Sequence, residues 1–466
     1  MQYKAKQTHY AIQSKAKTKT IFPENGSTFS PTGTSTIRFN MTGDLIDFSE
    51  SYISFTLNIS TQAGSPDYSS TAFINRWIVR GAGGTIVDDF PALNVYATAM
   101  FQARSSTEFL KSTGSFWGCP KIPYKGTQKG LVASGASRDM ALPLSWGILG
   151  ASAPIPMFLL PTGLQLEIQL EHHTTALVHS TEGATYTLTN VEMHLHDIKV
   201  ESDTKSELMA KVASEGQFEI PYEGVEIIPD SYSATAGGTK ICRLPSSATS
   251  IRAVYGLIRD ESYISTGVAA SLSCRTGEGF SSCYLTNGAD TYPEGRITNK
   301  VKAYHELKKA LGHSLPDSSG VGQITYDSYT AVTPVDITTS VSSYDDAVTH
   351  TFALTSISKA LGVDWADMAE TVVPIIASTA TVTTTASSTH SPLTTFMVGV
   401  DTESFEKDDE RLKSGIPYDN MSMTYVFSDP LLFDATPTYH ARRFDHVLIV
   451  DKSMLIMPNG MVATKV

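Results

Sequence analysis

Two histidines with a spacing that suits metal binding lie in the stretch HLHDIKV. His194 and His196 are two residues apart, and residues two apart on a strand share a face, so both imidazole rings could reach one ion. Met193 and Leu195 alternate with them, and these apolar residues are expected to occupy the buried face of the strand. No later segment supplies a matching histidine as a further ligand. The pattern therefore predicts a polar, solvent-facing strand surface and no metal site.

The other clusters of reactive side chains are explained by turns and surface charge. His172 and His173 are neighbours, so on a strand their rings point to opposite faces and make poor joint ligands. The glycines of RGAGG (80–84) lie between two strand-like runs, which predicts a tight turn and not a phosphate-binding loop. The acids of 399–415 lack the spacing of a calcium loop: Asp401, Glu403, Asp408, Asp409 and Glu410. We expect no catalytic residue, cofactor or metal, while paired carboxylates that meet only in space remain an open alternative.

Composition describes a large chain built from short strands. With 466 residues there is room for two or three domains. Hydrophobic residues make up 41% and charged residues 18%, and abundant Gly, Pro, Ser and Thr favour turns and strands over long helices. No apolar run reaches about 18 residues, and the opening MQYKAKQTHY is polar, so neither a membrane-spanning helix nor a secretory signal is expected. Four cysteines show no CxxC pair, so free thiols are expected, with a Cys274–Cys283 bridge as the alternative: Cys119, Cys242, Cys274 and Cys283.

The first twenty residues form a basic segment on an acidic chain. They hold five lysines and no acid. Since the whole chain carries −12 and this segment +5, the remainder carries −17. We expect residues 1–20 to be an N-terminal arm that contacts nucleic acid or another acidic layer, or that serves only as a solubilising terminus. Five lysines neutralise at most about five phosphates, which suits an ancillary, non-specific contact. The candidate contact residues are Lys4, Lys6, Lys15, Lys17 and Lys19.

Strand-like alternation follows from residue 37 to about 200. It is present in IRFNM (37–41) and in 53–59, and 73–90 is predicted to be a hairpin. The stretch 91–104 has helical spacing after a starting proline. The clearest strand is LQLEIQLEHH (164–173), and we expect it to pair with TYTLTNVEMHLHDIKV (185–200) in a sheet that is covered on one face only.

A charged helical segment, 201–216, divides this half from a second half of the same kind. From 217 onward strands are expected at 217–228, 239–245, 250–260, 394–401, 420–427 and 445–451, with a closing hairpin that turns at Asn459-Gly460. The best helix is 297–313, with Ile297, Val301, Tyr304, Leu307 and Leu311 on one face. The Thr/Ser-rich stretch 377–392 is expected to be an exposed loop or hairpin. Many short strands with few helices predict an all-β chain of sandwiches or jelly rolls.

The order of these segments resembles that of a known family. STIRFNMTGD, FINRWIVRGAGGTIVDDFPALNVYATAM, IPMFLLPTGLQLEIQLE, SIRAVYGLIRD and TTFMVGVDTESFEKDDERLKSGI follow one another over about 37–450. This succession is similar to the double jelly-roll major capsid proteins of double-stranded DNA viruses, especially those of virophages, polintons and polinton-like viruses.

The resemblance implies a virion protein with two eight-stranded antiparallel jelly rolls, at 21–200 and 217–466. Three copies would form a pseudo-hexagonal capsomer that tiles an icosahedral shell around the genome, assembled inside the infected cell. The partners implied are the protein itself, minor capsid and penton proteins, and the genome or an internal layer contacted by the arm. A shell subunit needs rigid, self-complementary surfaces and no reactive side chain, which fits the absence of chemistry described above.

Two other functions are compatible with the strand pattern. A β-sandwich that binds carbohydrate or another ligand would need an exposed aromatic platform, and Trp77, Trp117, Trp146 and Trp365 are too scattered to predict one. A jelly-roll enzyme of the cupin kind would use His194 and His196, although the glycines that bracket the cupin motif are missing. A glycosidase-like enzyme is the other enzymatic alternative.

Overall fold

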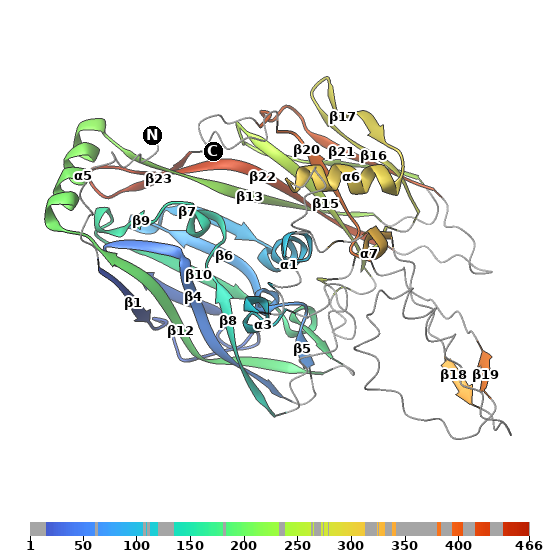
Figure 1. Cartoon of the computed structure of the whole chain (residues 1–466), viewed down its shortest axis with the longest axis horizontal. Helices are drawn as coiled ribbons and strands as arrows, with labels where there is room; N and C mark the ends of the chain where they lie inside the picture. Colours follow the sequence, from blue (N-terminus) through green and yellow to red (C-terminus); the bar gives the residue numbers. More distant parts are fainter. Residues whose placement is uncertain are drawn as a thin grey trace.

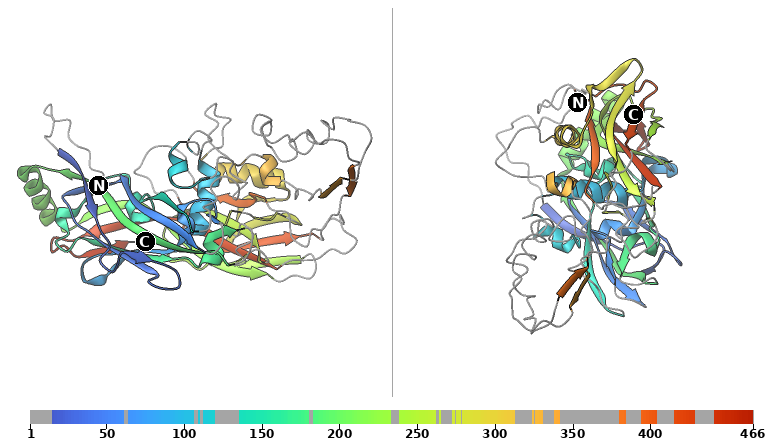
Figure 2. Two further views of the ribbon diagram at one scale, coloured as in Figure 1. Left: turned by 90° about the horizontal axis from the view of Figure 1, so that it is seen from below. Right: turned by 90° about the vertical axis from the view of Figure 1, so that its right-hand side faces the viewer.

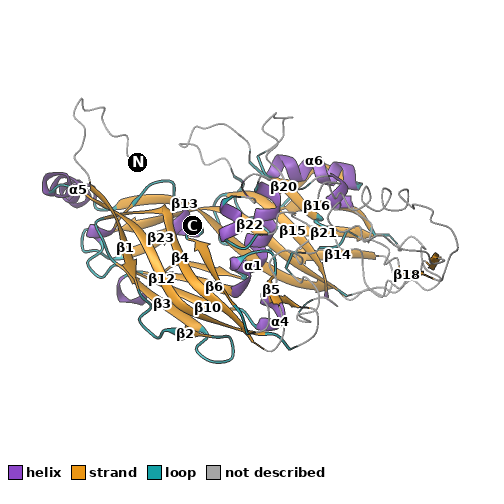
Figure 3. Cartoon of the chain, turned by 60° about the horizontal axis from the view of Figure 1, so that its bottom comes forward, coloured by secondary structure: helices purple, strands orange, loops and turns teal. Residues whose placement is uncertain are grey.

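The first half of the chain forms two facing sheets, shown in Figures 1 and 3. In this computed structural model one sheet has the strand order β1-β12-β4-β8 and the other has the order β3-β10-β6-β7. Short strands β2 (Thr28–Phe29) and β9 (Ile155–Pro156) extend the first sheet, and β5 (Gly64–Pro66) pairs with β11 (Leu177–His179). The main strands are β1 (Lys15–Ile21), β3 (Thr36–Met41), β4 (Leu45–Ser60), β6 (Ile74–Arg80), β7 (Ile86–Pro91), β8 (Ser137–Pro143), β10 (Leu164–Leu170) and β12 (Thr185–Lys199).

The second half repeats this plan. Its sheets have the orders β13-β22-β15-β20 and β14-β21-β16-β17, and β23 (Val462–Lys465) adds to β22. The main strands are β13 (Phe218–Tyr232), β14 (Gly238–Arg243), β15 (Ile251–Asp260), β16 (Phe280–Asn287), β17 (Asp290–Ile297), β20 (Met397–Asp401), β21 (Ser422–Phe427) and β22 (Arg442–Ile456).

Both halves have the same connectivity. When the eight main strands of each half are numbered along the chain, the two sheets read 1-8-3-6 and 2-7-4-5 in both. This order is that of an eight-stranded jelly roll, so the predicted fold class is confirmed. The right-hand view of Figure 2 shows the second jelly roll above the first. The structure describes residues 15–60, 64–105, 109, 112–119, 135–179, 183–232, 238–261, 264, 272–273, 275–277, 279–312, 324, 326–330, 338–341, 380–383, 394–403, 415–428 and 441–465.

The expected pairing of 164–173 with 185–200 is wrong. Strand β10 pairs with β3 and β6, whereas β12 pairs with β1, β2 and β4 in the opposite sheet. Alternation shows which face of a strand is buried but does not show which strand lies beside it. In a jelly roll the seventh and eighth strands belong to opposite sheets, and the chain passes from one sheet to the other between them. The hairpins at 73–90 and at Asn459-Gly460 are confirmed by the β6–β7 and β22–β23 pairs.

Three helices occur where the sequence predicts them. Helix α1 (Leu93–Arg104) follows the fifth strand of the first jelly roll, and α6 (Lys300–Ala310) follows the fifth strand of the second. Helix α5 (Ser202–Glu215) lies between the two halves, buries only Val212, and ends at Gly216 with a φ of 78°. Helix α6 begins later than expected because Ile297 still belongs to β17, and Asn299 caps its first turn. Val301, expected on the buried face of α6, is 61% exposed.

Short elements complete the fold. The Thr/Ser-rich stretch contributes β19 (Ala380–Thr383), which pairs with β18 (Thr338–Val341), while the rest of 377–392 lies outside the described residues. The remaining short α-helices of the described residues are α3 (Thr113–Phe116), α4 (His173–Ala176) and α7 (Tyr326–Thr330). In the described part of the chain, no helix combines the length and apolar character needed to cross a membrane.

Candidate assembly surfaces

The two histidines with metal-binding spacing lie on the outer face of β12. His194 is 2.9 Å from Ser54 Oγ through Nε2, and its ring stacks on Tyr52 with a centroid distance of 4.7 Å. Met193 and Leu195 are buried on the opposite face, as the alternation predicts. Across the described residues, no group of three or more His, Cys, Asp or Glu side chains could hold a metal ion.

The other described candidate residues take part in helix capping, turns and ion pairs. His172 caps the short helix α4, and the RGAGG segment turns the chain from β6 into β7. Asp401 lies 3.6 Å from Lys309 Nζ, and Glu403 lies 3.4 Å from Arg252 Nε. Asp408, Asp409 and Glu410 lie outside the described residues.

The described cysteines and tryptophans are packed in the protein interior. Cys119, Cys242 and Cys283 are buried free thiols, and burial raises the pKa of Cys119 to about 12. Cys274 and Trp365 lie outside the described residues. Trp77 and Trp146 are buried and Trp117 is packed against the core, so these three do not form the exposed platform that a carbohydrate-binding sandwich would need.

Three of the five candidate lysines belong to a strand, not to an arm. Lys15, Lys17 and Lys19 lie on β1, which is the first strand of the jelly roll and pairs with β12 from Lys15–Lys199 to Ile21–Met193. Lys19 Nζ donates to the carbonyl oxygen of Thr42 at 2.6 Å. The strand escaped prediction because KAKTKT shows no apolar alternation: its inner edge carries lysines where a core strand would carry aliphatic residues. Lys4 and Lys6 lie outside the described residues.

The two jelly rolls meet along an interface that no sequence motif announced. Strand β7 and the turn before it face β13 and β23, where Tyr222 and Thr464 donate to the Val87 carbonyl oxygen at 3.1 and 2.7 Å. A Cβ on Gly81 would lie 1.9 Å from Val462 Cγ2, so this close approach requires glycine. This part of the junction depends on a backbone carbonyl group and a glycine, which leave no signature in the sequence.

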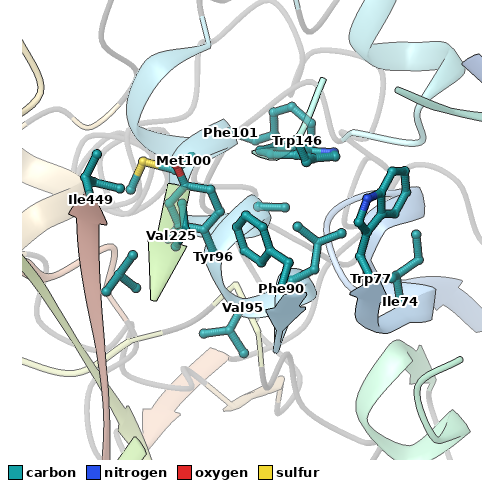
Figure 4. Packing of buried hydrophobic residues seen from close by; sticks show 14 of the residues in the cluster. Ile74, Trp77, Phe90, Val95, Tyr96, Met100, Phe101, Trp146, Val225 and Ile449 are labelled. Carbon is teal, nitrogen blue, oxygen red and sulfur yellow. The ribbon is translucent and has the colours of Figure 1, made fainter. Parts of the chain in front are cut away.

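Helix α1 of the first jelly roll packs against the sheet of the second. Figure 4 shows its residues Tyr96 and Met100 next to Val225 and Ile449, and Tyr96 Oη lies 3.4 Å from Glu223 Oε1. A hollow of about 530 Å³ remains beside this contact. Its walls are largely aromatic and include Phe90, Tyr96, Phe101, Trp117 and Trp146.

A buried carboxylate connects the two halves. Asp67, which is fully buried, accepts hydrogen bonds from the Leu272 backbone N–H and the Ser273 hydroxyl, both at 2.6 Å. Gln102 of α1 donates to the Ser273 carbonyl oxygen at 2.8 Å. Burial raises the pKa of Asp67 to about 6, although the two hydrogen bonds oppose this change. An aspartate in PDYSS gives no sequence signal for this role, because its partners lie about 200 residues away.

The sheet facing away from the second jelly roll has a polar outer surface. Strand β12 alternates buried and partly exposed residues along its whole length, so only its inner face is covered. In the corresponding strand of the second jelly roll, β22, seven consecutive residues from Phe444 to Val450 are buried, so both faces are covered there. The same position in the two jelly rolls therefore has different surroundings.

Comparison with known proteins supports the fold. No protein-family model matches the chain, and no curated protein does. Among solved structures, the chain is similar to the PBCV-1 VP54 structure fitted into a reconstruction of the virophage Sputnik, with a TM-score of 0.60, 10% identity and 98% of each chain covered. The cryo-electron microscopy structure of the Sputnik virophage gives 0.58 and 9%, covering 100% of this chain and 91% of the other. The mavirus major capsid protein gives 0.51 and 12%, covering 96% and 90%. The chain thus has the double jelly-roll fold of these capsid proteins.

Proposed function

We propose that this double jelly-roll chain is a viral major capsid protein. In this role three copies form a capsomer with six jelly rolls, and the capsomers tile an icosahedral shell that encloses the genome. The observation that carries the proposal is the repetition of one strand order in both halves, in a fold shared over nearly the whole length of known capsid proteins. Two similar units in each chain give a trimer six similar units, which suits packing among six neighbours.

The proposed role is structural and not enzymatic. The polar clusters of the described residues are engaged in caps, turns and ion pairs, as with His172, Asp401 and Glu403. We propose the division 21–200, 201–216 and 217–466 as the two jelly rolls and their connector, with β1 added to the first. The proposed location is the virion, with minor capsid and penton proteins as further partners.

We also propose that the segment before β1 contacts the genome or an internal layer. Since Lys15, Lys17 and Lys19 are part of a sheet, the contact would rest on Lys4 and Lys6. Deleting residues 1–14 tests this idea without removing β1, and normal yields of filled particles from the truncated protein would count against it. Deleting residues 1–20 would be a poor test because it removes most of a strand that pairs with seven residues of β12.

The main test of the function is the assembly state of the purified protein. Native mass measurement should give trimers of a 50.3 kDa chain, and electron microscopy should show hexagonal plates or closed shells. A protein that stays monomeric at high concentration and binds a carbohydrate or turns over a small molecule would refute the proposal.

A further inference from the structure

Helix α1 and the sheet β13-β22-β15-β20 contact each other within the chain. Each has a counterpart in the other jelly roll, α6 and the sheet β1-β12-β4-β8, and these two counterparts do not contact each other. Helix α1 follows the fifth strand of the first jelly roll and has every residue from Leu93 to Ala103 buried. Its own jelly roll covers one side of it, through β6 and the turn Ser70–Phe73, and the outer face of the sheet β13-β22-β15-β20 covers the other side (Figure 4). Helix α6 holds the same place in the second jelly roll, yet it buries only Ala303 and Leu307.

The inner side of α6 rests on its own jelly roll. A Cβ on Gly399 of β20 would lie 2.9 Å from Leu307 Cδ1, and the Tyr255 hydroxyl donates to the Ala310 carbonyl oxygen at 2.6 Å. The opposite side exposes Val301, Lys302 and His305. Helix α6 carries four lysines and one glutamate, and although Lys309 pairs with Asp401 of β20, the outward surface stays basic, with an exposed aliphatic residue.

In the described part of the chain, no α-helix packs on the outer face of the sheet β1-β12-β4-β8. Its outer face is identified by cross-strand neighbours: Glu192 is opposite Ser54, and Thr56 is opposite Asp139. Thr56 donates to Asp139 Oδ1 at 2.8 Å on this face. The carboxylates Asp47, Glu192 and Asp139 lie at outer positions, and no lysine or arginine occupies an outer position of the described strands β1, β12, β4 and β8. This outer face is therefore acidic.

One chain cannot bring these two surfaces together. Strands β1 and β12 lie at the lower side of the molecule in Figure 1, whereas α6 lies at the upper right, against β20 of the second jelly roll. The two views of Figure 2 keep the same separation. The surfaces can meet only between copies, and because they differ, the contact is head-to-tail and closes into a ring when the rotation per copy allows it.

We infer that α6 of one copy docks on the acidic outer face of β1-β12-β4-β8 of the next copy. Within one chain, α1 of the first jelly roll packs on the second jelly roll. The proposed contact would repeat this packing between neighbouring chains, so that all jelly rolls of a ring make similar contacts. Lysine side chains of α6 would face Glu192 and Asp139, and Val301 would be covered. This inference rests on the proposed function, because it specifies the contact that joins copies in the capsomer.

Charge exchange tests the inference. The pair Lys302→Glu with Lys308→Glu on α6, and separately the pair Glu192→Lys with Asp139→Lys on the sheet, should each raise the trimer dissociation constant by about tenfold or more at low salt. When the two double variants are mixed, the reversed charges match at the contact between a copy of each kind, so association should partly recover. Lys211→Glu on α5 and Asp290→Lys on β17 are matched controls that should leave the dissociation constant within about twofold.

Crosslinking gives an independent readout. A carbodiimide, which joins lysine to carboxylate without a spacer, should link α6 peptides to β12 or β8 peptides in trimers mixed from light and heavy isotope-labelled chains, and the links should join light to heavy. Stable wild-type trimers that tolerate both double variants, or α6 links only to other surfaces, would overturn the inference and leave the capsid function intact. Wild-type protein that forms neither trimers nor shells would instead refute the proposed function.

Discussion

Replacing the buried Asp67 by asparagine should change how the stability of the protein depends on pH. Asp67 joins the two jelly rolls through Leu272 and Ser273, and burial raises its pKa from 3.8 to about 6. A carboxyl group with a raised pKa favours the protonated form in the folded state. Its stabilising contribution is therefore complete below about pH 4 and is lost as the pH rises through about 6.

The size of the effect follows from the pKa values. A change from 3.8 to about 6 corresponds to about 3 kcal/mol in the free energy of unfolding, as an upper bound for one fully buried group. The substituted amide stays neutral at every pH and keeps an acceptor oxygen for one of the two donors. Relative to the wild type, Asp67→Asn should therefore be less stable near pH 4.5 and should gain on it by about 2 kcal/mol between pH 4.5 and pH 7.5, because about a third of the full contribution is already lost at pH 4.5.

Urea unfolding at several pH values measures this difference. Both proteins share all other titrating groups, so the difference between their unfolding free energies isolates Asp67. Amide hydrogen exchange of peptides that contain Leu272 should show the same trend locally, because its N–H donates to Asp67. Asp290→Asn, at an exposed position of β17, is the control. A difference between wild type and Asp67→Asn that stays constant from pH 4.5 to 7.5 would refute the reasoning.

Two further predictions concern a buried histidine and two glycines with a positive φ. His446 is fully buried, and burial lowers its pKa to about 4, so the free energy of unfolding should fall by up to about 3 kcal/mol as the pH falls from about 6.5 to 4. In His446→Phe this loss of stability at acidic pH should be smaller. If urea unfolding shows the same loss in the variant as in the wild type, His446 is not its cause. Gly163→Ala should cost more than Gly216→Ala, because both have a positive φ but only at Gly163 would the new Cβ lie 2.3 Å from a backbone oxygen, that of Met41. We expect about 1 kcal/mol at Gly216 and about 3 kcal/mol or more at Gly163, and equal thermal shifts for the two variants would show that the turn adapts.

The sequence predicted individual strands better than it predicted which strands pair with each other. LQLEIQL and the segment 185–199 were correctly identified as strands because one face of each is apolar and the other polar. Their assignment to one sheet failed because strand pairing in a jelly roll depends on contacts between distant residues. Strand β1 was missed for a different reason: it is an edge strand whose lysines stay exposed or half-buried, and such a strand needs no apolar residues.

The junction between the two jelly rolls and the exposed side of α6 were even harder to predict from the sequence. The junction at Val87 uses a backbone carbonyl, and the partners of Asp67 are about 200 residues away, so neither leaves a local pattern. Likewise, Val301 has helical spacing that suggests a core position, but its side of α6 is uncovered in the single chain. A hydrophobic pattern predicts that a residue is buried. It does not predict whether the residue's own chain or another copy covers it.

A cryo-electron microscopy reconstruction of the purified oligomer tests the central claim most directly. We predict a ring of six jelly rolls from three chains, in which α6 of each chain contacts the β1-β12-β4-β8 sheet of the next. A reconstruction of a single chain, or of an oligomer whose copies meet through two identical surfaces and leave the ring open, would contradict the account.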